Sequence, residues 1–129
     1  MARRKTERLT PLELEIMQVL WDTGPANVQT VQQRLGRELA YTTVQTMLNV
    51  LYRKNKVKRT LRDKAYFYRP AVSRSQATGH AVRDLIDRMF GGSAEDLVMS
   101  LVETRHLTPE KLAQLNKLLE KEARNDQDQ

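Results

Sequence analysis

The stretch from Tyr41 to Pro70 decides the fold: YTTVQTMLNV LYRKNKVKRT LRDKAYFYRP. On a helical wheel that advances roughly 100° per residue, its first part has one apolar face and one polar face. The apolar face consists of Val44, Met47, Leu48 and Leu51. The polar face and its flanks carry short polar side chains and one arginine, namely Thr42, Thr43, Gln45, Thr46, Asn49 and Arg53. A helix with such a face can lie in the major groove of DNA.

Two short strands are predicted directly after this helix, over Val57 to Arg62 and Ala65 to Arg69. In both, β-branched or aromatic residues alternate with basic ones, and Asp63-Lys64 lies between them as a tight turn. A helix followed by a basic hairpin is typical of the reading half of a winged helix-turn-helix. Each feature also has an ordinary interpretation, as a surface helix or a solvated edge, but their adjacency favours DNA binding.

Two further helices are predicted before this stretch. Thr10 can be the N-cap of the first, Pro11 fits its first position, and Glu13 completes a capping box. Gly24 should end this helix, and Asn27 can cap a second, shorter one. Residues 1 to 8 precede both helices; they are rich in Arg and Lys and are expected to be a disordered tail or an arm that touches phosphates.

The pattern breaks at Pro70 to Ser73, so we place a domain boundary there: a winged helix over residues 1–72 and a helical domain over 73–129. The second domain should hold three helices with apolar stripes. A unit this small rarely buries enough surface alone, so we expect it to pack against its copy in a homodimer. The residues expected at that interface are Leu85, Met89, Leu97, Leu101, Leu112, Leu115, Leu118 and Leu119. The alternative is that these helices fold back on the first domain.

The charge of the chain is unevenly distributed. The net charge of the 129 residues is +6, but residues 1–72 carry +8 and residues 73–129 carry −2. A basic half joined to a mildly acidic half is expected of a polyanion-binding domain attached to a second module.

The composition excludes several classes of protein. There is no cysteine, which excludes disulfides and thiolate metal sites and fits a cytoplasmic location. No run of about 18 apolar residues is present, so no membrane segment is expected. His80 and His106 lack companions at ligand spacing, and Gly91-Gly92 is a helix stop rather than a phosphate loop. We therefore predict no enzyme, no catalytic residue, no metal and no cofactor.

Five segments together resemble the penicillinase repressor family of transcriptional regulators (BlaI/MecI/CopY type). They read LTPLELEIMQVLW, YTTVQTMLNVLYRKNKVKR, AYFYRPAVS, FGGSAEDLVMSLVE and LTPEKLAQLNKLL. The resemblance implies a homodimeric winged-helix repressor that binds inverted-repeat operator DNA. It places Thr43, Gln45 and Thr46 at groove-facing positions of the third helix, and Arg62 and Lys64 at a wing that contacts the DNA backbone.

The resemblance also bears on the signal that releases such a repressor. It implies an antibiotic (β-lactam) or other stress response, with a sensor protease that cuts an Asn-Phe bond in the dimerisation domain. The matching pair here is Ser100-Leu101, and Val50 stands where relatives often have arginine. The copper-responsive members use a cysteine cluster that this chain lacks.

Two other functions compete with this interpretation. A winged helix can be a protein-interaction adaptor without sequence-specific DNA binding, and steep salt dependence of DNA binding would separate the two. An RNA-binding domain is disfavoured, because the candidate stacking residues Tyr66 and Tyr68 are expected in the core.

Overall fold

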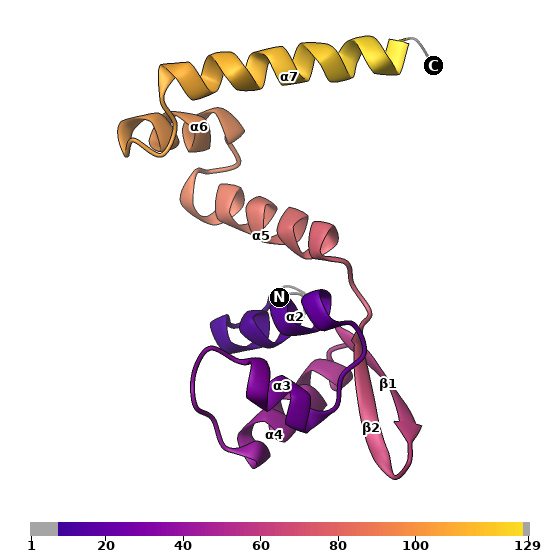
Figure 1. Cartoon of the computed structure of the whole chain (residues 1–129). Helices are drawn as coiled ribbons and strands as arrows, with labels where there is room; N and C mark the ends of the chain where they lie inside the picture. The colour runs from indigo at the N-terminus through magenta and orange to yellow at the C-terminus, as the bar shows by residue number, and fades with distance from the viewer. Residues whose placement is uncertain (1–7, 128–129) are drawn as a thin grey trace. The chain divides into compact units, whose positions relative to one another are not determined.

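The computed structural model describes residues 8–127, so the basic segment before residue 8 lies outside the described residues. The described chain is mainly helical with one antiparallel hairpin, as predicted, and Figure 1 labels each element. The elements are α2 (Pro11–Thr23), α3 (Val28–Arg34), α4 (Tyr41–Arg53), β1 (Val57–Arg62), β2 (Ala65–Pro70), α5 (Arg74–Met89), α6 (Ala94–Glu103) and α7 (Pro109–Gln127).

The chain divides into two compact units, and the boundary between them along the sequence falls within α5. The first ends at Arg83 and the second begins at Asp84. The division expected from the sequence, between residues 72 and 73, stays a prediction. We refer below to the N-terminal unit and the C-terminal unit.

Local signals account for the bounds of α2. The Thr10 hydroxyl accepts a hydrogen bond from the Glu13 backbone N–H at 3.2 Å, and the Glu13 carboxylate accepts one from the Thr10 N–H at 2.8 Å. This is the predicted capping box, with Pro11 as the first helical residue. Gly24 ends the helix with φ of 77°, a conformation that glycine adopts without steric cost.

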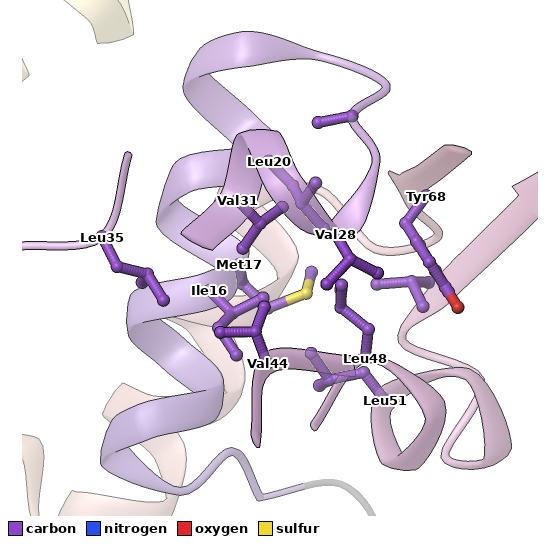
Figure 2. Packing of buried hydrophobic residues seen from close by; sticks show 12 residues of the cluster. Ile16, Met17, Leu20, Val28, Val31, Leu35, Val44, Leu48, Leu51 and Tyr68 are labelled. Carbon is purple, nitrogen blue, oxygen red and sulfur yellow. The ribbon is translucent and has the colours of Figure 1, made fainter. Parts of the chain in front are cut away.

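The core of the N-terminal unit lies between α2, α3, α4 and the base of the hairpin (Figure 2). Its buried apolar residues are Ile16, Met17, Leu20, Ala26, Val28, Val31, Leu35, Val44, Leu48, Leu51, Val57 and Tyr68. Met47, predicted on the apolar face of α4, is half-buried and packs against this core. Because one face of α4 packs in the core, its opposite face is exposed to solvent.

The hairpin has the predicted turn and one contact that the sequence did not indicate. Asp63 and Lys64 have φ of 50° and 67°, the left-handed values at both centres of a type I′ turn. Tyr68 also exchanges two backbone hydrogen bonds with Ala26, of 2.8 and 2.9 Å. This bridge fastens the base of the hairpin to the segment between α2 and α3.

The first turn of α5 is tied to α2. The Trp21 indole N–H donates to the Val72 carbonyl at 3.0 Å, and Arg74 forms an ion pair with Asp22 at 2.8 Å. The Arg74 guanidinium also lies 5.5 Å from the centre of the Trp21 ring. These contacts belong to the N-terminal unit.

The C-terminal unit has well-formed helices but buries little. Gly91 and Gly92 have positive φ and follow α5, and the Ser93 side chain caps α6 by accepting from the Asp96 N–H at 3.1 Å. No residue from 84 to 126 is buried. Large apolar side chains are exposed on all three helices, namely Leu85, Met89, Val98, Met99, Leu115, Leu118 and Leu119.

Within the described residues, no helix is long and apolar enough to cross a membrane.

Candidate nucleic-acid interface

The outer face of α4 presents short polar side chains to solvent. Thr42, Thr43, Gln45 and Thr46 are all exposed, and their side chains make no hydrogen bond to another described residue. Val44 and Leu48, on the other side of the helix, are fully buried. The first two turns of α4 therefore offer free donors and acceptors on a helix whose orientation is fixed by the core.

The last two turns of α4 differ, because one predicted contact residue is engaged with the hairpin. Arg53 is exposed, but Asn49 is half-buried. The Asn49 side-chain oxygen accepts hydrogen bonds from Arg59 at 3.4 Å and from the Tyr68 hydroxyl at 3.3 Å. Since arginine cannot accept, the amide oxygen must face the hairpin. The bidentate adenine contact of asparagine, which needs that oxygen, is not available in this arrangement.

Arg59 lies between two tyrosine rings. Its guanidinium carbon is 3.9 Å from the centre of the Tyr52 ring of α4 and 4.3 Å from that of Tyr66 of β2. The prediction that Tyr66 belongs to the core is wrong: its side chain is 42% exposed and packs on the arginine. A signal was present in the sequence, because counting back from the Asp63-Lys64 turn places Arg59 diagonally across from Tyr66.

The two faces of the hairpin have different surroundings. The register pairs Val57 with Pro70 and Arg59 with Tyr68, so these residues share the face that continues from the core. The other face carries Lys58, Thr60, Arg62, Phe67 and Arg69. On that face Arg69 donates to Thr60 at 3.3 Å, and the Arg62 guanidinium lies 5.4 Å from the Phe67 ring centre. Arg62 and Lys64, the predicted wing contacts, are both exposed near the turn.

A buried ion pair fixes the end of α4 against the start of α2. Lys54 donates to both carboxylate oxygens of Glu13 at 2.8 and 2.9 Å, and Glu13 is 1% exposed. Burial alone would raise the pKa of the Glu13 carboxyl, but the hydrogen bonds from Lys54 and from the Thr10 N–H together outweigh it and lower the pKa. The sequence did not predict this pair, because its members are 41 residues apart.

The residues predicted for dimerisation all lie in the C-terminal unit. Leu85, Met89, Leu115, Leu118 and Leu119 are exposed. The other three are half-buried: Leu97, Leu101 and Leu112. Ser100 and Leu101, the pair at the possible cleavage position, are both half-buried within α6. Among the described residues, no group of three or more His, Cys, Asp or Glu side chains could hold a metal ion.

Comparisons with known proteins show similarity to transcriptional regulators. The sequence model of the family described as "Penicillinase repressor" matches residues 9–121. The "Transcriptional regulator BlaI" of Mycobacterium tuberculosis is 37% identical over 103 residues, covering 77% of this chain and 75% of that protein. The "Penicillinase repressor" of Bacillus licheniformis is 24% identical over 119 residues, covering 91% of this chain and 93% of that protein.

A solved structure shares the fold. It is the homodimeric winged helix-turn-helix DNA-binding domain of a possible ArsR-family regulator from Mycobacterium bovis. It is 21% identical, covers 72% of this chain and 83% of that one, and has a TM-score of 0.50. The predicted winged helix-turn-helix is thereby confirmed.

Proposed function

Because the chain belongs to the penicillinase repressor family, we propose that it represses transcription as a homodimer bound to inverted-repeat operator DNA. The observation that carries this proposal is the pairing, in one compact unit, of an exposed polar helix face with a basic hairpin. Thr43, Gln45 and Thr46 on α4 supply the base contacts, and Arg62 and Lys64 supply contacts to phosphates. Relatives named as repressors that match most of the chain support the assignment.

The division of labour within the interface follows from side-chain chemistry. Glutamine and threonine carry oriented donors and acceptors that can discriminate base edges in the major groove. Lysine and arginine near the turn of a hairpin are long cations that suit phosphate oxygens, which are the same in every sequence. Base preference is therefore assigned to α4, and the salt-dependent part of the affinity is shared with the wing.

The exposed apolar side chains of the C-terminal unit are the basis for proposing a homodimer. Its helices expose leucine and methionine side chains while burying no residue of their own between 84 and 126. A second copy of the same unit is the partner that would cover such stripes symmetrically. Two linked winged helices then bind two half-sites that lie one or more helical turns apart on one face of the duplex.

The test begins with selection of bound DNA from a random pool by the full chain. On the selected duplex, Gln45→Ala or Thr46→Ala should cost about 1–3 kcal/mol and relax base preference at one position. Lys64→Ala should weaken binding to every duplex alike and reduce the slope of log affinity against log salt by about one unit. A chain that selects no sequence and binds DNA without steep salt dependence would instead support the adaptor function.

The Ser100-Leu101 bond lies at the position where the family resemblance implies cleavage by a sensor protease. Both residues are half-buried inside α6, so a protease reaches the bond only after local opening of the helix. Leucine also differs from phenylalanine in a way worth about 1–3 kcal/mol in a pocket built for the other. We therefore expect a protease specific for Asn-Phe to leave this chain uncut. Fragment masses after incubation check this, and efficient cleavage after Ser100 would restore the antibiotic-response function.

A further inference from the structure

The side chain of Arg59 is the only one in the described hairpin that contacts both α4 and the opposite strand through its charged group. Tyr52 and Asn49 come from α4, Arg59 from β1, and Tyr66 from β2. The guanidinium is held by two ring faces, at 3.9 and 4.3 Å, and by the Asn49 oxygen at 3.4 Å. Three elements thus converge on one planar cation.

The Arg59 contact lies at the point along the hairpin where support from the core ends. The base of the hairpin is already secured, because Val57 and Tyr68 are buried and Tyr68 is bridged to Ala26. Beyond Arg59 the hairpin runs out to its turn, where Leu61 is 62% exposed and Arg62, Asp63 and Lys64 are all exposed. A two-stranded hairpin without further support is only marginally ordered. Within the described residues, the stack on Arg59 is the outermost ring contact or hydrogen bond between the hairpin and α4.

We infer that Arg59 is a positioning residue that holds the outer part of the wing at a fixed place relative to α4. This inference rests on the proposed DNA-binding function. Base contacts from α4 and phosphate contacts from the wing can be made together only if the two elements meet the duplex in one register. Arg59 fixes the position of the wing relative to α4, and its charge stabilises the stack with the two tyrosine rings instead of binding a phosphate.

The chemistry of the stack requires arginine specifically. A guanidinium is planar and can lie flat between two rings while donating a hydrogen bond at its edge. A lysine ammonium has the same charge but is compact and strongly hydrated, so it cannot fill the space between Tyr52 and Tyr66. Arg59→Lys therefore removes the positioning function and keeps the charge.

The experiment uses the full chain and the duplex that the wild-type chain selects, with Arg69→Lys as the matched control on the other face of the hairpin. Arg59→Lys should lower affinity about tenfold and reduce the salt slope by about one unit, as if a phosphate contact were lost without loss of charge. Arg69→Lys should change neither. Tyr52→Ala should reproduce the effect of Arg59→Lys. Thermal unfolding of each variant establishes that binding is measured on folded protein.

A double-mutant cycle separates positioning from direct contact. If Arg59 positions the wing, Lys64→Ala should weaken binding in the wild-type chain and have little further effect in the Arg59→Lys chain. If Arg59 itself bound phosphate, Arg59→Lys would be tolerated and the two substitutions would be additive. That additive result overturns the inference while leaving the proposed function intact.

A measurement without DNA keeps the inference testable even if the chain binds none. In the free protein, ring currents from Tyr52 and Tyr66 should shift the Arg59 side-chain resonances upfield. Backbone amides between Leu61 and Tyr66 should exchange with solvent faster in Arg59→Lys than in Arg69→Lys. Equal exchange rates in the two variants would show that the stack does not hold the wing.

Discussion

The two units of this chain start their helices with the same signal and complete them differently. Thr10-Pro11 opens α2 and Thr108-Pro109 opens α7, and in both cases the threonine hydroxyl accepts a hydrogen bond from a backbone N–H, at 3.2 Å in each. In the N-terminal unit the helices and hairpin enclose a core of fully buried side chains. In the C-terminal unit no residue from 84 to 126 is buried.

The difference shows that an apolar stripe indicates which face of a helix favours burial. It does not indicate whether the residues that cover this face come from the same unit. In α4 the stripe is covered by α2, α3 and the hairpin, all from the same unit. In α7 the stripe ends in Leu118 and Leu119, which are 60% and 62% exposed. The first unit should therefore be stable as a monomer, whereas the second should depend on association.

The largest effect is expected where charge enters the exposed stripe. Leu115→Glu with Leu118→Glu should leave a monomer in sedimentation, because two carboxylates would have to be buried in an apolar interface. Operator affinity should fall by about 10²–10⁴-fold, since the second half-site loses its effective concentration. Gln114→Glu with Asn116→Glu adds the same charge at exposed polar positions and should leave the dimer intact. A dimer that survives the leucine substitutions would move the interface to the N-terminal unit.

A pair of leucine truncations should separate the two kinds of stability. Leu48→Ala removes a fully buried side chain and should cost about 2–5 kcal/mol at any protein concentration. Leu118→Ala should change the unfolding of the winged helix little, and any cost it has should depend on protein concentration. Trp21 is the sole tryptophan and lies in the N-terminal unit, so its fluorescence follows that unit alone. A concentration-dependent cost for Leu48→Ala would contradict the comparison.

A smaller effect is expected from acid. The folded-state pKa of Glu13 is lowered below its ordinary value of 4.5, so its pairing with Lys54 stabilises the N-terminal unit above about pH 4.5. That stabilisation is lost as the pH falls through the lowered pKa. Glu13→Gln should reduce the loss between pH 6 and pH 3 by about 1–3 kcal/mol, as measured by urea unfolding. Glu15→Gln removes only an ion pair with the exposed Arg37, so it should change the pH dependence of the free energy of unfolding much less.

Local patterns in the sequence were enough to predict the helices, the hairpin and its turn. The 3.6-residue period of Val44, Leu48 and Leu51 fixed which face of α4 turns outward, and Thr10 and Asn27 marked helix starts that their observed caps confirm. These signals are local because each depends on residues within one or two turns of one another.

The features that the sequence did not reveal join residues far apart. The Glu13–Lys54 pair and the Ala26–Tyr68 bridge each depend on how separate elements pack. The type of a residue alone does not identify a partner that is distant in the sequence. The error at Tyr66 has a related cause. Tyr66 and Tyr68 share one face of the hairpin, but the core covers that face only as far as Tyr68. Strand alternation predicts the face and not how far its cover extends.

At the wing turn, the backbone conformation of Lys64 favours glycine, whereas the proposed phosphate contact requires a cationic side chain. At φ of 67°, Lys64 occupies a conformation in which glycine is favoured by about 1 kcal/mol or more over a residue with a Cβ atom. Lys64→Gly should therefore raise the free energy of unfolding of the N-terminal unit while removing a cation from the turn. Under the proposed function, Lys64→Gly should therefore raise stability and lower operator affinity at the same time, so the turn would trade backbone strain for an ammonium group at the wing.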